Sequence, residues 1–276
     1  MTIGNKIGIF DSGVGGLTVA KAICQAAPVS ISYLGDTAHT PWGNQAAAAI
    51  QQYSISISNV LFNKGCDIIV IACNSASALA YQHVTSYLNS KAIVFNVIDP
   101  VAKHIAQKFS HKNVGIIGTR QTIHSKTYKK KIHNLNPTVQ INELATAVLA
   151  PLIEDGLATS ALGYQFVEHY LSNPLLADID ALVLGCTHYP LLLPTVKKYY
   201  ENIGKEVEII DSAQLIAKEL ITVLGEKIYK YIDPNHKNEF TLTSDSAFFK
   251  KIAHNFFGEN IEFTASPHHT LEVSNL

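Results

Sequence analysis

Short apolar runs alternate along the chain with longer segments in which apolar residues recur every three or four positions. The short runs predict buried strands, and the longer period predicts amphipathic helices. Regular alternation of the two predicts an α/β fold with mostly parallel sheets that carry helices on both faces. We expect strands at residues 6–10, 31–34, 67–72, 92–97, 113–117, 139–141, 180–184, 207–210, 239–243 and 261–264.

The expected helices lie between these strands, at residues 17–26, 45–64, 76–88, 101–109, 122–135, 158–171, 192–202, 215–231 and 246–257. Two proline-containing stretches are interpreted as interruptions, because proline lacks the amide that a helix interior needs. They are Asp99-Pro100, expected to break the chain, and Pro151–Gly156, expected to form a loop.

Two strand ends repeat in sequence. The stretch Asp67–Ser75 (DIIVIACNS) aligns without a gap with Asp180–His188 (DALVLGCTH), so that a cysteine followed by a short polar residue ends each strand. A second pair, Lys6–Ser12 and Asn113–Thr119, matches in its apolar residues, a glycine and a terminal hydroxyl. Two matched strand ends indicate an internal duplication.

The duplication predicts two similar lobes, each a mostly parallel sheet flanked by helices, related by a pseudo-twofold axis with a cleft between them. The first lobe is expected to comprise residues 1–97 plus 211–276, and the second residues 98–210. The tail after residue 211 is assigned to the first lobe because its apolar residues need a surface to cover.

Composition narrows the possible classes of protein. The 276 residues are 47% hydrophobic and 16% charged, which is typical of an ordered α/β protein, and no apolar run reaches the length of a membrane span. A net charge of -1 gives no general attraction to polyanions. The lysine-rich stretch Lys126–Lys131 is a candidate nucleic-acid patch, but a solvated helix face is the favoured interpretation. No nucleic-acid partner is expected.

The start of the chain lacks a basic segment followed by a long apolar core, so no secretory signal is predicted. We therefore expect a cytoplasmic protein with reduced cysteines. Cys24 and Cys66 are interpreted as small core residues.

Cys73 and Cys186 suggest the chemistry. In parallel sheets, ligands bind at the carboxyl ends of strands, where both cysteines are expected to approach the cleft from opposite sides. Each precedes a predicted helix, whose N–H groups and dipole should lower the thiol pKa. A thiolate on one side of a substrate and a thiol on the other form an acid–base pair that inverts a carbon stereocentre. Such a reaction requires no cofactor in principle.

Three ionisable residues are candidates to assist the two cysteines. His188 follows Cys186 by two residues, Asp11 ends the first strand, and Glu154 is available to orient His188 or to contact a substrate ammonium group. Other interpretations remain open: His188 as a core residue, Asp11 and Ser12 as helix caps, and Glu154 as a solvated carboxylate. Neutral hydrogen bonds to carboxylates are expected from Ser12, Asn74, Ser75, Thr119 and Thr187 and from the backbone N–H of Gly43 and its neighbours.

Two binding motifs are not found. The turn Gly13–Gly16 lacks the glycine spacing of a dinucleotide site, and no phosphate-binding loop follows it. Zinc bound by Cys73, Cys186 and His188 is a minor alternative, because no fourth ligand stands at a recognisable spacing. No metal is expected.

Five motifs identify a family. They are Gly8–Thr18, Tyr33–Thr37 with Pro41–Gly43, Ala72–Ala76, Leu184–Pro190 and Ile210–Ser212. With them the chain resembles the cofactor-independent glutamate racemases of the aspartate/glutamate racemase superfamily over nearly its whole length.

The resemblance implies that Cys73 deprotonates D-glutamate and Cys186 deprotonates L-glutamate, with Asp11 and His188 assisting the respective thiols and Glu154 as a further acidic residue. It implies substrate contacts by Ser12, Pro41, Trp42, Gly43, Asn74, Ser75, Thr119 and Thr187, with Asp11 among the substrate-binding groups. It further implies a role in peptidoglycan synthesis, a homodimer and, for some members, binding to DNA gyrase.

The chain departs from the family pattern at three positions. Trp42 replaces the usual tyrosine, Ser75 the usual threonine, and His39 stands where arginine is common. Two rival functions stay open at this point: a racemase for aspartate or another amino acid, and a non-catalytic regulator that binds an amino acid or gyrase.

Overall fold

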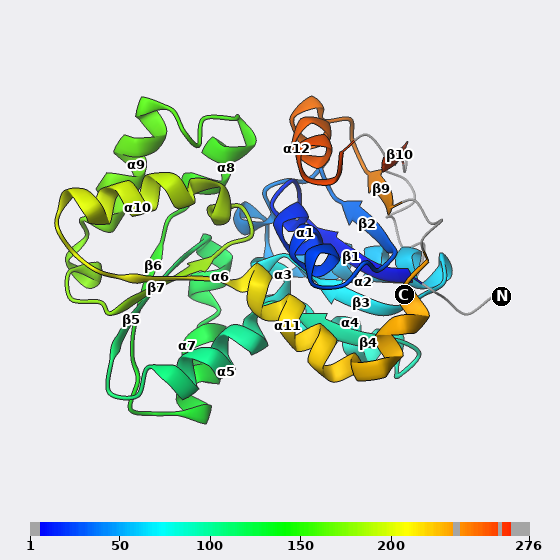
Figure 1. The fold of residues 1–276 in the computed structure, drawn as a ribbon, viewed down its shortest axis with the longest axis horizontal. Coiled ribbons are helices and arrows are strands. Elements are labelled where there is room, and N and C mark those ends of the chain that lie inside the picture. The colour runs from blue at the N-terminus through cyan, green and yellow to red at the C-terminus, as the bar shows by residue number, and fades with distance from the viewer. Residues whose placement is uncertain (1–5, 234–237, 259–260, 266–276) are drawn as a thin grey trace.

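The computed structural model describes residues 6–233, 238–258 and 261–265. Ten strands alternate with helices in the described part of the chain (Figure 1). The strands are β1 (Lys6–Asp11), β2 (Ile31–Gly35), β3 (Cys66–Ile71), β4 (Ile93–Asn96), β5 (Asn113–Gly118), β6 (Gln140–Ala145), β7 (Ala181–Gly185), β8 (Glu208–Asp211), β9 (Asn238–Leu242) and β10 (Ile261–Ala265). All the expected strands are therefore present.

Twelve α-helices connect these strands within the described residues. They are α1 (Gly16–Ala26), α2 (Ala47–Asn63), α3 (Asn74–Leu79), α4 (Tyr81–Leu88), α5 (Ile98–Lys108), α6 (Arg120–His124), α7 (Thr127–Leu135), α8 (Leu149–Glu154), α9 (Ala161–Leu171), α10 (Leu193–Asn202), α11 (Ser212–Leu224) and α12 (Ala247–Phe257). Two of the expected helices are each divided into two, α3 with α4 and α6 with α7.

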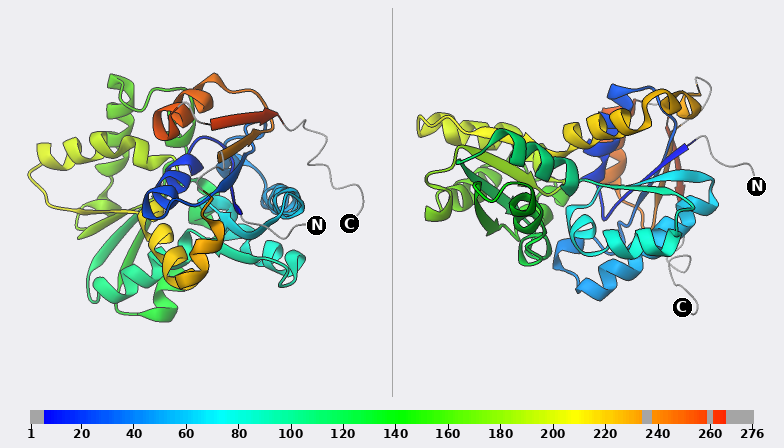
Figure 2. Two further views of the ribbon diagram at one scale, coloured as in Figure 1. Left: turned by 45° about the vertical axis from the view of Figure 1, so that its right-hand side comes forward. Right: turned by 90° about the horizontal axis from the view of Figure 1, so that it is seen from below.

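The strands form two separate sheets. The first has the order β10-β9-β2-β1-β3-β4 and the second the order β6-β5-β7-β8, and every pairing is parallel. We call each sheet with the helices packed on it a lobe, and the two lobes stand side by side in every view (Figures 1 and 2). The prediction of two α/β lobes with parallel sheets is confirmed.

The topology repeats between the lobes. The order β2-β1-β3-β4 in the first sheet matches β6-β5-β7-β8 in the second, so β1 corresponds to β5 and β3 to β7. These are the strands whose ends repeat in sequence. The duplicated sequence has thus kept the same strand order.

Helices cover both faces of each sheet because successive side chains of a strand point to opposite faces. In β3, Ile68 and Val70 join the core cluster beneath α1 and α11, whereas Ile69 and Ile71 join the cluster beneath α2. The strand β7 divides its side chains between two clusters in the same way. A continuous apolar strand sequence is what such two-sided burial requires.

The tail packs on the first lobe, as expected. The strand β9 pairs with β2, β10 pairs with β9, and α12 contributes Phe249 and Ala253 to the core beside α1. The predicted lobe boundaries at residues 97/98 and 210/211 stay a prediction, and residues 266–276 of the predicted first lobe lie outside the described residues.

Both predicted interruptions at proline were wrong. Asp99 and Pro100 lie in the first turn of α5, and Pro151 lies in the first turn of α8, which continues to Glu154. The first turn of a helix has no intrahelical partners for its amides, so proline is tolerated there.

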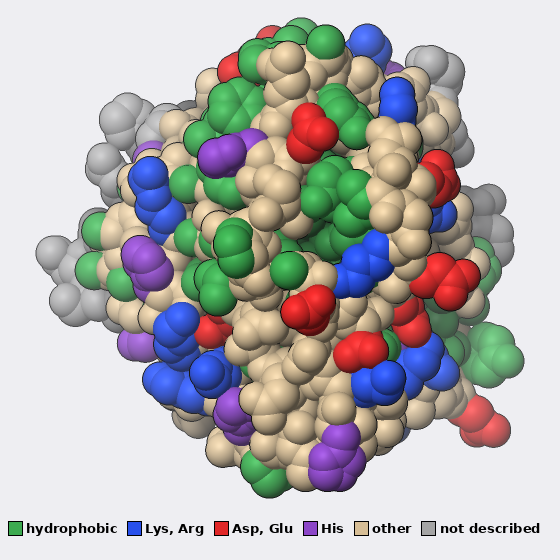
Figure 3. Space-filling view, turned by 90° about the vertical axis from the view of Figure 1, so that its left-hand side faces the viewer, with side chains coloured by type: hydrophobic (Ala, Val, Ile, Leu, Met, Phe, Trp, Pro, Cys, Tyr) green, Lys and Arg blue, Asp and Glu red, His purple; other side chains and the backbone are tan. Residues whose placement is uncertain are grey.

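The lysine-rich segment forms a solvated helix face. Lys126 pairs with Glu143, and Lys131 pairs with Asp99. On the outer side of the second lobe, positive and negative side chains lie next to one another in several places (Figure 3). Among the described residues, none of the helices has the length and apolar character needed to cross a membrane.

Candidate active site

Both cysteines line one narrow cavity between the lobes. Cys73 follows β3 in the first lobe and Cys186 follows β7 in the second, and each residue is only 5% exposed. Most of the predicted contact residues share this lining, which consists of Ser12, Pro41, Gly43, Cys73, Asn74, Ser75, Thr119, Ala150, Cys186, Thr187 and His188. Residues far apart in sequence meet here because most of them follow the carboxyl end of a strand or lie in the loop beyond it.

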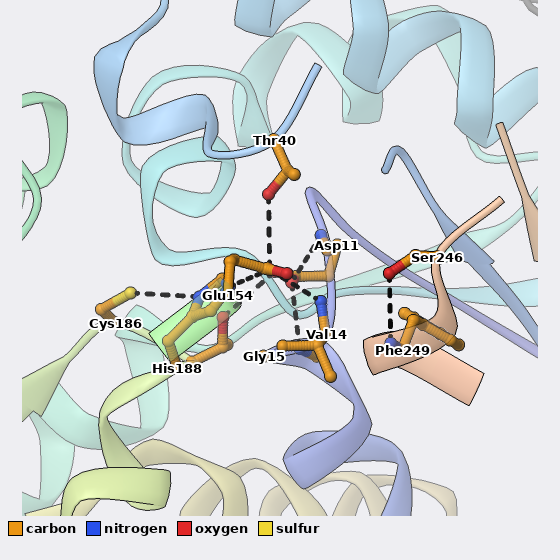
Figure 4. A network of polar contacts seen from close by, with 12 residues as sticks. Asp11, Val14, Gly15, Thr40, Glu154, Cys186, His188, Ser246 and Phe249 are labelled. Atoms are coloured by element: carbon orange, nitrogen blue, oxygen red, sulfur yellow. Dashed lines mark hydrogen bonds and ion pairs between the residues drawn. The ribbon is translucent and has the colours of Figure 1, made fainter. Parts of the chain in front are cut away.

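A chain of polar contacts extends from Cys186 (Figure 4). The Sγ atom of Cys186 lies 3.5 Å from Nδ1 of His188, and Nε2 of His188 lies 2.6 Å from Oε1 of Glu154. His188 is 2% exposed. Glu154 thus holds the imidazole ring in one orientation, with its other nitrogen directed at the thiol.

Glu154 also connects the two lobes. It belongs to α8 of the second lobe, and its Oε1 accepts hydrogen bonds from the backbone N–H of Val14 and the hydroxyl of Thr40 in the first lobe. The close approach depends on Gly13, because a Cβ atom there would collide with the Glu154 carboxylate. Glu154 is therefore an interior carboxylate rather than a solvated one.

Asp11 occupies a fully buried position at the end of β1. Its Oδ2 accepts the N–H groups of Gly13 at 3.1 Å and Gly16 at 2.9 Å, and its Oδ1 accepts the hydroxyl of Thr187 at 3.1 Å. The first two bonds hold the turn before α1, and the third crosses to the second lobe. Asp11 thus fixes the turn before the helix and also lies beside the reactive centre.

The pKa values of the ionisable groups follow from burial and from their neighbours. Burial lowers the pKa of His188, but the Cys186 thiolate and Glu154 more than compensate and raise it well above its ordinary value. Burial raises the pKa of Glu154, but the hydrogen bond and charge of His188 bring it below its ordinary value. The geometry therefore favours a positive His188 paired with a negative Glu154.

At Asp11 and Cys73 the effect of burial dominates and raises both pKa values, which favours the uncharged forms. Burial raises the pKa of Asp11 despite the charge of His188 and the bonds from Gly13 and Gly16. Burial and then the charge of Asp11 raise the pKa of Cys73, and the N–H groups at the start of α3 offset only part of this. The expected lowering at a helix start was wrong for Cys73, because desolvation outweighs the backbone contribution.

Three hydroxyl groups meet at the lobe junction beside the thiols. Ser75 Oγ lies 2.8 Å from Thr119 Oγ1 and 3.3 Å from Thr122 Oγ1, and the two threonine oxygens are 3.0 Å apart. Ser75 comes from the first lobe and the threonines from the second. Sequence reasoning missed Thr122, although it stands one helical turn after Thr119.

The side chain of Trp42 does not line the cavity, in contrast to its neighbours Pro41 and Gly43. It is fully buried in the core with Phe10, and its Nε1–H donates to Oδ2 of Asp36 at 2.9 Å. The large indole ring turns toward apolar neighbours and a buried acceptor, so the substrate contact predicted for Trp42 stays a prediction for its backbone alone. Its role is to anchor the cavity-lining turn.

Within the described ranges, no group of three or more His, Cys, Asp and Glu side chains is arranged to hold a metal ion. The fold and the site together define an α/β enzyme whose duplicated lobes each present one thiol, with its own ionisable neighbours, to a shared buried centre.

Comparison with known proteins gives the particular family. The profile of the Asp/Glu/Hydantoin racemase family matches residues 22–220. A glutamate racemase of Geobacter metallireducens is 36% identical over 254 residues, which cover 91% of this chain and 92% of that protein. The chain belongs to the Asp/Glu/Hydantoin racemase family and is an amino-acid racemase, an isomerase.

Solved structures of glutamate racemases have the same fold as this chain. The glutamate racemase of Francisella tularensis in complex with D-glutamate has a TM-score of 0.85 and 30% identity, covering 97% of this chain and 98% of that one. A glutamate racemase isoform from Bacillus anthracis has a TM-score of 0.86 and 35% identity, covering 95% of this chain and 97% of that one. The fold expected from the resemblance is therefore confirmed.

Proposed function

We propose that this protein interconverts L-glutamate and D-glutamate by a two-base mechanism in which Cys73 and Cys186 act on opposite faces of the substrate. The observation that carries the proposal is the meeting of the two thiols, one from each lobe, at one enclosed cavity. The similarity of this protein to glutamate racemases over most of the chain supports glutamate as the substrate.

The proposed step transfers two protons. The Cys186 thiolate removes the proton from Cα of L-glutamate, and the electron pair of the broken C–H bond remains on the substrate as a carbanion delocalised into its α-carboxylate. The Cys73 thiol then donates its proton to the opposite face of Cα, which forms the new C–H bond and leaves Cys73 as a thiolate. The reverse reaction starts from that state with D-glutamate.

The electrostatics of the site support this assignment. His188, whose pKa is raised, lies 3.5 Å from Cys186, whereas burial and the charge of Asp11 raise the pKa of Cys73 and favour its protonated form. The favoured starting state is thus suited to the L-to-D direction. In this state Glu154 orients His188, and Asp11 acts on Cys73 through its charge.

Substrate contacts are proposed for the polar groups that line the cavity. Ser12, Asn74, Ser75, Thr119, Thr187 and the Pro41–Gly43 turn supply hydroxyl, amide and backbone groups suited to two carboxylates. Trp42 is excluded from this set except through its backbone.

Incubation with L- or D-glutamate in deuterated buffer tests the proposal, with optical rotation and deuterium at Cα followed together. Wild-type protein should invert both enantiomers and place solvent deuterium in the product. Cys73→Ser and Cys186→Ser should each abolish inversion, whereas Cys24→Ser serves as a thiol control because Cys24 lies outside the cavity. Absence of both inversion and exchange in the wild type would refute the proposal.

The biological setting is proposed on the family resemblance. It comprises a cytoplasmic enzyme that supplies D-glutamate for peptidoglycan and acts as a homodimer. Binding to DNA gyrase is a further expectation from some family members, to be tested by co-purification with the purified gyrase subunits.

A further inference from the structure

Asn74 has one polar atom with a short hydrogen bond and one with none. The hydroxyl of Tyr128 donates to Oδ1 of Asn74 at 2.6 Å, across the junction between α7 of the second lobe and α3 of the first. The amide nitrogen Nδ2 is buried and has no hydrogen-bond partner among the described residues. A buried donor without a partner is costly, so its retention calls for an explanation.

The location of Asn74 supplies that explanation. It directly follows Cys73 and lines the cavity, together with the hydroxyl groups of Ser75 and Thr119. Since Oδ1 is engaged by Tyr128, Nδ2 is the amide atom left for a ligand. An N–H donor suits a carboxylate, whereas a carboxamide turned the other way would present an oxygen and repel it.

Tyr128 is built to hold this orientation. Its ring is fully buried in the core of the second lobe beside Ile132, so that the hydroxyl has little freedom to move. Burial, and then the charges around it, raise the pKa of Tyr128, so the phenol keeps its proton and acts as a donor. A donor at this point selects the oxygen of the carboxamide and leaves the nitrogen free.

We propose that Tyr128 is a positioning residue, which fixes the Asn74 carboxamide so that its nitrogen donates to a carboxylate of the bound amino acid. The inference rests on the proposed function and deepens it, since it assigns a role to a residue of the second lobe that does not line the cavity. Without the phenol hydroxyl, the amide loses its preferred orientation, and its contact with the substrate weakens.

The test compares steady-state racemisation by wild type and Tyr128→Phe. The variant keeps the ring and removes only the hydroxyl. Because a carboxylate contact is made in both the ground state and the transition state, KM for both enantiomers should rise about tenfold while kcat changes little. Tyr200→Phe is the matched control, because the Tyr200 hydroxyl is also buried but has no partner among the described residues, and Tyr200 lies outside the cavity.

A second variant separates positioning from general structure. In an Asn74→Ala background, Tyr128→Phe should add no further increase in KM, because the group it positions is gone. An unchanged KM in Tyr128→Phe, or an equal increase with and without Asn74, would overturn the proposal. Thermal unfolding of each variant checks that it is folded.

The two proposals fail in different ways. A wild type that racemises neither enantiomer of glutamate refutes the proposed function and removes the basis of this inference. An active wild type with a Tyr128→Phe variant of unchanged KM refutes only the role of Tyr128. Calorimetric titration with racemic glutamate, which undergoes no net reaction, gives the same comparison as a dissociation constant, expected to be about tenfold weaker in Tyr128→Phe.

Discussion

Replacing Glu154 by glutamine removes one negative charge from the site and preserves the shape of the side chain. In the native protein this carboxylate lies 2.6 Å from Nε2 of His188, with side-chain exposures of 15% for Glu154 and 2% for His188. A hydrogen bond to a charged group contributes about 1.5–3 kcal/mol. Loss of that amount from the transition state corresponds to a fall in kcat/KM of roughly 10- to 150-fold.

The two reaction directions must respond together. L-glutamate and D-glutamate have equal free energies, so the ratio of kcat/KM for the two directions is fixed by an equilibrium constant of one. Glu154→Gln should therefore lower kcat/KM equally for both enantiomers, although Cys186 is the only one of the two thiols that His188 contacts. The individual values of kcat and KM are free to change unequally, since the bound states are not mirror images.

Circular dichroism follows the initial rate for each enantiomer over a range of concentrations. Glu168→Gln provides the control, because it makes the same chemical change on the exposed face of α9. The variant at Glu154 should show the predicted loss, and the control should not. A value of kcat/KM within about twofold of wild type for Glu154→Gln would refute the view that the Glu154–His188 pair supports the reaction.

Three further outcomes are expected. The stability difference between wild type and Glu154→Gln, measured by urea titration at several pH values, should be greatest between about pH 4.5 and 6.5 and shrink on either side. The lowered pKa of Glu154 stabilises the folded protein above the ordinary value of 4.5, and the raised pKa of His188 stabilises it below the ordinary value of 6.5. Gly43→Ala should lower kcat/KM at least about tenfold, because the added Cβ would collide with Thr119 and displace the cavity-lining turn; an active, folded variant contradicts this. Trp42→Phe should lower the free energy of unfolding by about 1–3 kcal/mol, because Asp36 loses a buried donor, and an unchanged urea midpoint contradicts this.

Much of the fold could be predicted from the sequence because burial on two faces leaves a clear pattern. Continuous apolar segments, most of them followed by a glycine or a polar residue, predicted the strands and the sheet edge at which ligands bind. The repeat of Asp67–Ser75 in Asp180–His188 revealed the duplication, because the same strand end performs the same structural task twice. The repeated strand order agrees with that inference.

What could not be predicted depends on side-chain direction and on contacts between lobes. The position of Trp42 in the turn was correct, but a turn sequence does not determine whether an indole ring points to the core or to the cavity. Tyr128 was hidden among lysines, and only its spacing of four residues from Ile132 indicated the buried face of α7. Its partner Asn74 belongs to the other lobe, which local sequence patterns do not reveal.

The duplication leaves the two thiols at equivalent positions, yet the residues two places further on differ. Ser75 follows Cys73 and supplies a neutral hydroxyl, whereas His188 follows Cys186 and is held by a carboxylate from α8. Two-base inversion must start with one thiol protonated and the other ionised, and two identical surroundings would leave both arrangements equally populated. For the proposed mechanism, the difference between Ser75 and His188 offers a means of selecting the starting arrangement. This preference for one arrangement must remain small. Each turnover leaves the proton on the other thiol, and a substrate of the opposite hand requires that second arrangement.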